Sequence, residues 1–518
     1  MSGALRGGSK LSLREKIGYG LGDTASNLVF QLALNFITRF YTDVAMIDAF
    51  QVGLIMLVVR FIDAITDPVM GAFADRQNSR WGRYRPFLLW FAVPFGLSAL
   101  LAFSIPELHE NGKFIYAMIT YALLMIVYTA INIPYCALAA SMTSDPDERS
   151  SIQSWRFVGG QTGALVVSSM TLPLVALLGQ GDDVAGWRYT AAVFGVLSVI
   201  LFVACFLLTR ERVKVAASAA PADLWGDFAA LFQNDQWRRL AIIQLFLLTF
   251  LVMRATVTFY FVDEFYGTVD GKSAGYLVTA FFTLGSIGAI VGSFEANRVS
   301  SNGPMRELLL LALVQIGLSI LFVVVGIATV EMAVYAGCAV LAGVVLSEVI
   351  GAMFGRIGAL SMLFIAQGMA HLALYMVGGN DFLLALALFV GIMFINQVAV
   401  PIIWSLMTDS VDYGEWKTGR RVAGLNFSVN LFALKMGVMF GGVIAAWTLA
   451  FYGYDAELEL QTEQTLQGIS MAFALIPGFL CFITALLASQ LKLTRGHMRE
   501  IQAELDKRNP DRHEEIET

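Results

Sequence analysis

The 518-residue chain has few charged residues: Asp, Glu, Lys and Arg make up only 14% of it, whereas 57% is hydrophobic. A soluble chain of this length would form two or three domains with charged surfaces, and these residues are too few to cover them. The charges are confined to short stretches between apolar runs of about twenty residues, the length of a transmembrane helix. The composition therefore excludes an ordinary soluble protein and predicts a multi-pass membrane protein.

Cysteine and histidine are also scarce, with four of each. The cysteines all fall inside apolar runs and lack CxxC spacing, so neither a disulfide nor a metal site is predicted. The net charge of -6 leaves no basic patch for nucleic acid. The polar N-terminal segment lacks the apolar core of a cleaved signal peptide. The loops contain no P-loop or nucleophile elbow, which argues against an enzyme, and no cofactor is expected.

Long apolar runs recur along the whole chain, and each can cross about 30 Å of hydrocarbon as a helix. None alternates in the way that a barrel strand would, so an all-α membrane protein is predicted. The runs lie at residues 17–41, 50–74, 86–105, 114–143, 157–179, 187–209, 239–264, 273–297, 306–328, 331–355, 357–378, 382–408, 422–452 and 465–491.

A long polar stretch divides these runs into two groups. It predicts an N-terminal bundle of six helices at 1–209, a cytoplasmic linker at 210–238, a C-terminal bundle at 239–491 and a cytoplasmic tail at 492–518. The linker contains DLWGDFAALF, which can form a short interfacial helix. Two runs between 306 and 355 are extra relative to a six-plus-six pattern. Alternatively, one or both are irregular or interfacial, because Glu348 lies in the second.

Lys and Arg gather at one end of successive apolar runs, as in Arg76 to Arg85 and Lys417 to Arg421, whereas the opposite loops are acidic or neutral. Positive charges stay on the cytoplasmic side of a membrane. Both termini are therefore predicted to be cytoplasmic. A bacterial inner membrane is the expected location.

The sharpest polar motif is VVRFIDAITDP, in the second apolar run. Arg60, Asp63 and Asp67 fall on one helical face, with Thr66 beside them. Two carboxylates so close in a low dielectric do not both ionise comfortably without a cation. A bound Na+ or a shared proton satisfies the pair, and so does a permanent ion pair with Arg60 or with a lysine from another helix.

Polar groups suited to a polyhydroxyl ligand occur in several other runs. In the fourth run, Tyr128, Thr129 and Asn132 are spaced to present a phenol, a hydroxyl and an amide toward one side. Asn27 and Arg156 are weaker candidates of the same kind. Interhelical hydrogen bonds that only hold the bundle together are an equally open interpretation.

In the second half, Trp404, Asn430 and Lys435 place an aromatic, an amide and a cation at membrane depth. An ammonium at that depth needs a carboxylate partner, and Asp63 or Asp67 is the obvious one. Alternatively, Lys435 extends into a water-filled crevice.

Two charged cytoplasmic motifs, ADRQNSRWGRYRP and DSVDYGEWKTGRR, occupy corresponding places in the two halves. Such clusters fit gates between halves that rock against each other, although they also serve positive-inside topology. The gating candidates are Asp75, Arg76, Arg80, Arg83, Asp409, Asp412 and Arg420.

Across nearly its whole length the chain resembles the glycoside, pentoside and hexuronide:cation symporter family. The resemblance rests on KIGYGLGD, FYTDV, RFIDAITDP, SRWGRYRP, INIPY, DYGEWKTGRR and MREIQAELDKR. It implies a major facilitator fold of two pseudo-symmetric bundles with 12 core helices and two possible extra helices in the C-terminal half. It also implies symport of a sugar or glycoside with Na+ or H+ by alternating access, in a protein that acts as a monomer.

The resemblance assigns roles by position. Asp63 and Asp67 fall where the family's cation-binding carboxylates lie, and Thr129 falls where a hydroxyl completes that site. Lys435 matches a lysine that links the cation and sugar sites, and Arg156 matches an arginine near the sugar.

The chain departs from the melibiose permease of that family at three positions. Asn27 and Asn132 stand where that permease has sugar-binding aspartates, and Cys136 stands where it has a tryptophan, so its sugar specificity does not transfer. Because the family also contains lysophospholipid carriers, a lipid carrier stays open, as does a non-transporting sensor.

Overall fold

The computed structural model describes residues 11–77, 79–143, 146–212, 224–269, 271–301, 317, 320–420, 422–458 and 460–508. Within these ranges the regular structure is helical, apart from two isolated β-bridges. The chain divides into two compact units, which we describe separately. Unit 1 comprises Met1–Ala219 with Leu449–Gln461, and unit 2 comprises Ala220–Thr448 with Thr462–Thr518.

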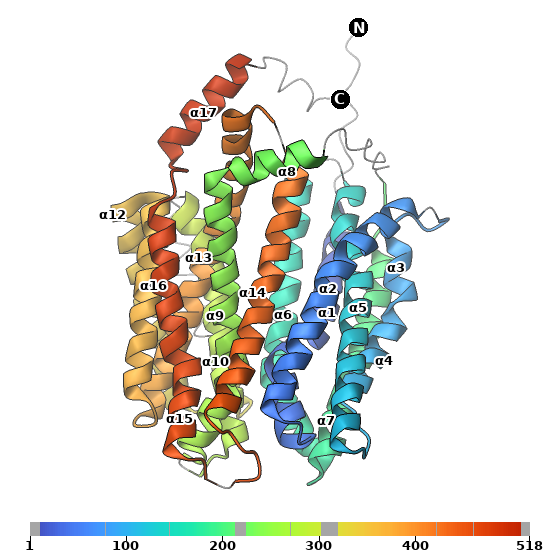
Figure 1. Ribbon diagram of the computed structural model, residues 1–518, viewed down its shortest axis with the longest axis vertical. Helices are drawn as coiled ribbons and strands as arrows, with labels where there is room; N and C mark the ends of the chain where they lie inside the picture. The colour runs from blue at the N-terminus through green and yellow to red at the C-terminus, as the bar shows by residue number, and fades with distance from the viewer. Residues whose placement is uncertain are drawn as a thin grey trace. The chain divides into compact units, whose positions relative to one another are not determined.

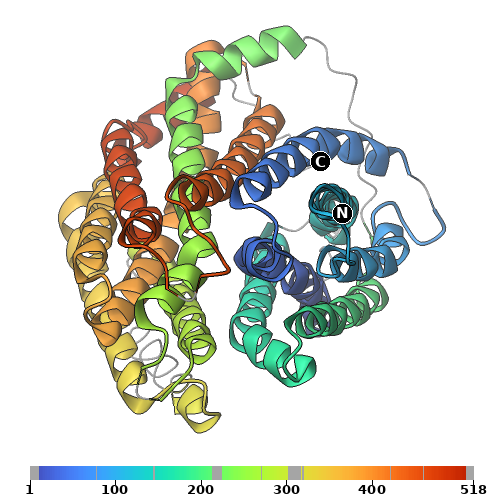
Figure 2. The same cartoon turned by 60° about the horizontal axis from the view of Figure 1, so that its bottom comes forward.

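Unit 1 is a bundle of helices that run side by side (Figures 1 and 2). The first helix begins at Ser12, whose hydroxyl and Glu15 form a capping box. The helices are α1 (Leu13–Arg39), its π-helical continuation η1 (Phe40–Val44), α2 (Ala49–Arg76), α3 (Arg85–Trp90), α4 (Ala92–Ala102), α5 (Glu110–Met142), α6 (Pro146–Gly179) and α7 (Asp183–Leu208).

The apolar run predicted at 86–105 is two helices, α3 and α4, separated at Phe91. Pro94 explains this break, because it has no N–H to donate and its ring crowds the carbonyl four residues earlier, that of Trp90.

Helices α1 and α6 of unit 1 pack closely because glycines face each other. A Cβ added to Gly159 would lie 2.1 Å from the carbonyl oxygen of Gly20, a distance at which no side chain fits. Small residues allow helix backbones to approach in this way inside membranes. The approach brings Asp23 and Arg156, each one turn from these glycines, toward each other.

Unit 2 begins with α8 (Leu224–Gln233), which runs across the end of its bundle (Figure 1). This helix confirms the one predicted from DLWGDFAALF. The others are α9 (Asp235–Tyr266), α10 (Ala274–Ser301), α12 (Val330–Val377), α13 (Phe382–Thr418), α14 (Ala423–Phe451), α15 (Glu463–Ser470), η2 (Met471–Leu475), α16 (Ile476–Ser489) and α17 (Arg495–Arg508).

Helix α12 is two helical segments joined at Gly355, whose backbone has φ 63° and ψ -176°. These segments correspond to the apolar runs predicted at 331–355 and 357–378. The first is helical in spite of Glu348, so this run is not irregular, and the interfacial alternative stays a prediction. Its Ser347 hydroxyl donates to Glu295 of α10 at 3.3 Å. Most of the run at 306–328 lies outside the described residues.

Within the described residues, nine helices are long and apolar enough to span a membrane. Helices α1 and α2, which carry polar residues discussed below, are not among them, and the two segments of α12 count as one. The all-helical membrane fold predicted from the sequence is confirmed in this general form.

Candidate functional site

Two carboxylates of α2 and a hydroxyl of α5 meet inside unit 1. The Thr129 hydroxyl oxygen lies 2.9 Å from one oxygen of Asp63 and 3.0 Å from one oxygen of Asp67. The hydroxyl carries a single hydrogen, so it donates to only one carboxylate at a time. Asp63 and Thr129 are buried, with 1% and 2% of their surface exposed, whereas Asp67 is half-buried. Asp63 and Asp67, which the sequence spacing predicted to share one face of α2, therefore lie close together.

Electrostatic repulsion works against this arrangement. The two aspartate oxygens lie at most about 6 Å apart, since both contact one hydroxyl. Two full negative charges at that distance repel by about 3 kcal/mol at an effective dielectric constant of about 20. A cation or a proton near the Thr129 hydroxyl removes this cost.

Arg60 provides part of the compensating charge. Its Nη1 lies 3.7 Å from Asp63 Oδ2, and its Nη2 donates to the Tyr121 hydroxyl at 3.2 Å. The ion pair with Arg60 considered from the sequence therefore exists, on the Asp63 oxygen that Thr129 does not contact.

Thr66 lies near the pair but is oriented differently from Thr129. Its hydroxyl donates to the backbone carbonyl of Asp63 at 3.0 Å, within α2. Its oxygen keeps lone pairs for a cation, and its predicted role as a cation ligand stays a prediction.

A second polar cluster joins α1 to α6. Arg156 Nε lies 3.2 Å from Asp23 Oδ1. The Asn27 amide donates to the backbone carbonyl of Asp23 at 2.9 Å and is 3.4 Å from its carboxylate, and Gln31 donates to Asn27 at 3.4 Å. The Arg156 guanidinium also lies over the ring of Tyr135. Sequence analysis selected Arg156 and Asn27 but missed Asp23, which precedes Asn27 by one helical turn.

The three candidates on α5 face different surroundings. Tyr128 stacks on Phe30 with ring centroids 5.2 Å apart. The Cys136 thiol lies 3.9 Å from the Asn132 amide oxygen, within the same helix. Tyr128, Asn132 and Cys136 are all half-buried. Their role in sugar binding stays a prediction.

The candidates of unit 2 occupy α13 and α14. Asn430 is 1% exposed and donates to the Gln244 side chain of α9, so its amide forms an interhelical hydrogen bond. Lys435 is half-buried, and Trp404 is 41% exposed. The predicted pairing of Lys435 with Asp63 or Asp67 would join the two units and stays a prediction.

A buried arginine in unit 2 was missed by the sequence analysis. Arg254 of α9 is 2% exposed, and its Nη2 donates to Met393 Sδ at 2.8 Å. Its Nη1 lies 3.4 Å from Nε2 of His371, which is fully buried. Each of the two residues is an isolated polar residue in its own apolar run. Local sequence spacing therefore does not indicate that they are in contact.

The charged loop after α2 is held by an acid from beyond α7. The Glu211 carboxylate accepts the backbone N–H groups of Arg83, Tyr84 and Arg85 at 2.8 to 2.9 Å. Arg80 is exposed and lies over the ring of Trp81. Glu211 was not a predicted residue, because its partners are backbone groups distant in the sequence.

Among the remaining gating candidates, Asp409 pairs with Arg356 inside unit 2. Arg356 also donates to Ser405 at 3.2 Å and to the carbonyl of Leu493 at 2.9 Å. Asp412 is half-buried and Arg420 is exposed. The side chains of Asp75 and Arg76 lie outside the described part of the chain. A gating role stays a prediction for all of them.

Comparisons with known proteins all find transporters. The model of the MFS/sugar transport protein family matches residues 18–340 and 313–495. The inner membrane symporter YicJ of Escherichia coli is 34% identical over 96% of this chain and 95% of its own. The putative glycoside/cation symporter YagG of the same organism is 33% identical over 96% of each chain. The solved D-xylose-proton symporter has the same fold, with a TM-score of 0.57 at 12% identity over 92% of this chain and 96% of its own.

Proposed function

Because the chain belongs to the MFS/sugar transport protein family, we propose that it imports a sugar or glycoside together with Na+ or H+ by alternating access. The observation that carries this proposal is the contact of the Thr129 hydroxyl with both Asp63 and Asp67. The two relatives described above are named as symporters, one of them a putative glycoside/cation symporter.

The cation site consists of the two carboxylates and the Thr129 hydroxyl. Oxygen ligands suit Na+, and the same pair of carboxylates can share one proton. Either ion reduces the repulsion between the two carboxylates. Asp63 and Thr129 lie on different helices, so an ion between them also holds α2 against α5.

The sugar site lies beside Asp23, Arg156, Asn27 and Gln31. A carboxylate accepts hydrogen bonds from sugar hydroxyls, whereas the guanidinium and amides donate to them. Tyr128, Asn132 and Cys136 on α5 are further sugar-binding candidates in unit 1. Trp404, Asn430 and Lys435 are the proposed sugar-binding residues of unit 2. Because Asn27 and Gln31 continue the polar face of α1 from Asp23, one ligand can contact all three.

The proposed architecture has 12 core helices, with the runs between 306 and 355 as two additional ones. Both termini are cytoplasmic in a bacterial inner membrane, and the protein acts as a monomer. The charged clusters that include Arg83 and Asp409 serve as the cytoplasmic gate.

The test is ion movement in de-energised membrane vesicles that contain the protein. Glycosides, pentosides and hexuronides are added one at a time while pH and Na+ electrodes record the medium. Uptake of one cation triggered by one sugar is the expected result, and Asp63→Asn should abolish it while the protein remains folded. Labelled sugar entry without ion movement would contradict coupling, and absence of both would contradict sugar transport.

A further inference from the structure

A cavity of about 550 Å³ lies in unit 2 where the two segments of α12 meet. Its wall includes the residues around Gly355, Ile402 of α13, Ser489 at the end of α16 and the chain that leads into α17. A pocket of a few hundred Å³ is large enough to bind a small molecule or part of a lipid. It contains none of the residues assigned above to the cation or the sugar.

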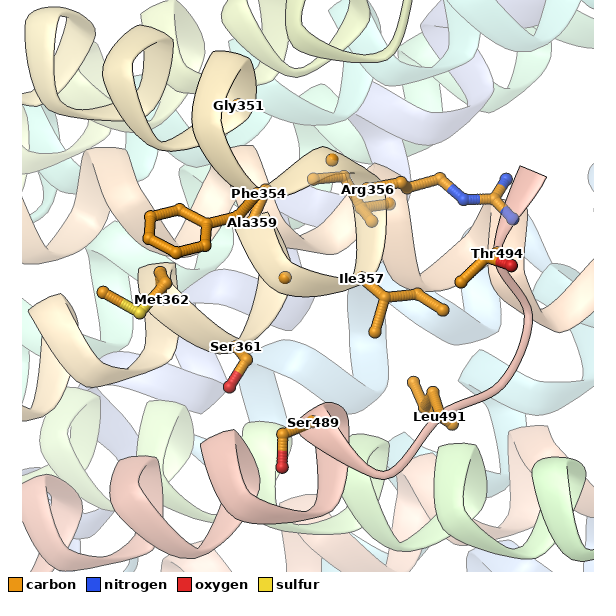
Figure 3. Close-up of a pocket in the computed structure, with 13 residues that line it drawn as sticks. Gly351, Phe354, Arg356, Ile357, Ala359, Ser361, Met362, Ser489, Leu491 and Thr494 are labelled. Carbon is orange, nitrogen blue, oxygen red and sulfur yellow. The ribbon is translucent and has the colours of Figure 1, made fainter. Parts of the chain in front are cut away.

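The two ends of this cavity, on either side of the backbone break at Gly355, are lined by different kinds of side chain. Figure 3 shows Phe354 and Met362 together on one side, and Arg356 with Thr494 on the other. The positive φ at Gly355 turns the chain sharply between Phe354 and Arg356. One end of the cavity is therefore apolar, and the other carries the Arg356 guanidinium, which is paired with Asp409.

The cationic end retains hydrogen-bonding capacity. Arg356 donates to Asp409, Ser405 and the Leu493 carbonyl, but its Nε is buried and has no hydrogen-bond partner among the described residues. An unsatisfied buried donor on a charged group costs free energy, which an anionic oxygen recovers. Lys492 is exposed next to Leu491, which lines the cavity, and adds positive charge nearby.

The apolar end borders the surface of the unit. Phe354 is 47% exposed, and its neighbour Met353 is 69% exposed. Exposed apolar side chains of this kind suit contact with lipid hydrocarbon. In the orientation proposed above, Arg356 and Lys492 lie at the cytoplasmic membrane surface, where anionic headgroups accumulate.

We propose that this cavity binds one anionic phospholipid of the cytoplasmic leaflet. Its phosphate lies against the Arg356 side chain, near Lys492, and an acyl chain lies along Phe354 and Met362. Two features favour a lipid over a soluble anion: the apolar half of the lining and its exposure to the bilayer. Because Arg356 also holds Asp409, the bound lipid contacts the same guanidinium as a proposed gate residue.

The test is native mass spectrometry of the purified full-length protein in detergent. Phosphatidylglycerol and phosphatidylcholine with identical acyl chains are added at equal concentrations. We expect the protein to retain one phosphatidylglycerol about fivefold more strongly than phosphatidylcholine, the effect of roughly one basic side chain at a membrane surface.

Two pairs of variants locate the lipid. Ser489→Trp fills the cavity and should remove the preference, whereas Ser489→Ala should keep it, because the Ser489 hydroxyl donates only to Leu486 of its own helix. Arg356→Gln should also remove the preference. Arg238→Gln, which changes an exposed arginine of α9 outside the cavity, should retain it.

Thermal unfolding of each variant shows whether it is folded, and Ser489→Trp keeps the ion pair of Arg356 with Asp409 intact. Equal retention of both lipids by the wild-type protein, or unchanged preference in folded Ser489→Trp, would overturn the proposal. Displacement of the lipid by soluble glycerophosphate at equal concentration would also overturn the proposal. It would show that the cavity binds a soluble phosphate compound instead.

Discussion

Arg156 of α6 forms an ion pair with Asp23 of α1, with 3.2 Å between Nε and Oδ1. The pair is possible because the Gly20 carbonyl lies directly against Gly159, one turn away on each helix. A packing feature of unit 1 thus determines where a charged pair sits in its interior.

Replacing Asp23 by Asn should weaken sugar binding by about ten- to a hundredfold, since hydrogen bonds to a charged group contribute about 1.5 to 3 kcal/mol. Binding of the transported sugar, measured by calorimetry, checks this. Cation binding to Asp63 and Asp67 should be retained in the same variant. Unchanged sugar affinity would remove Asp23 from the sugar site.

Thr129→Val keeps the shape of the side chain but deletes the oxygen between the two carboxylates. The cation concentration that gives half-maximal sugar uptake should rise by about tenfold or more, the effect of losing one charge-assisted hydrogen bond or ligand. Thr129→Ser retains the hydroxyl and should restore the wild-type value. Equal cation dependence in the Val and Ser variants would show that the hydroxyl is not a ligand.

Gly159→Ala should destabilise unit 1, because the new Cβ would collide with the Gly20 carbonyl. Overpacking of this kind costs about 1 to 3 kcal/mol. Thermal unfolding in detergent measures the loss. Gly337→Ala on α12 is the matched control: a Cβ there meets nothing within 4 Å, and alanine favours a helix. A similar melting temperature for both variants would contradict the close approach of α1 and α6.

Glu211→Ala should release the loop after α2, because three backbone N–H groups lose their acceptor. Hydrogen exchange followed by mass spectrometry should become faster at Arg83, Tyr84 and Arg85. Glu107→Ala, at an exposed glutamate on another loop, should leave these amides unchanged. Protection that persists without Glu211 would mean that other contacts hold the loop.

Features that depend on local sequence were predictable. The run predicted at 187–209 corresponds to α7 at Asp183–Leu208, and Asp63 and Asp67 lie on one face as their spacing requires. Asp23, Glu211 and Arg254 were missed, because each has its partner on a segment that is distant in the sequence. The break at Phe91 was also missed, although Pro94 signalled it. The surrounding residues form a continuous apolar run, which by itself predicts one unbroken helix. The steric effect of Pro94 on the carbonyl four residues earlier was therefore overlooked.

Gly355 has a consequence for how unit 2 fits the bilayer. A straight helix of the 48 residues in α12 would be about 72 Å long, more than twice the hydrocarbon thickness of about 30 Å. A Cβ at this position meets nothing within 4 Å, so backbone torsion rather than crowding favours glycine. Gly355 thus divides a helix that would be too long for the bilayer into two segments, each of which is about long enough to span it.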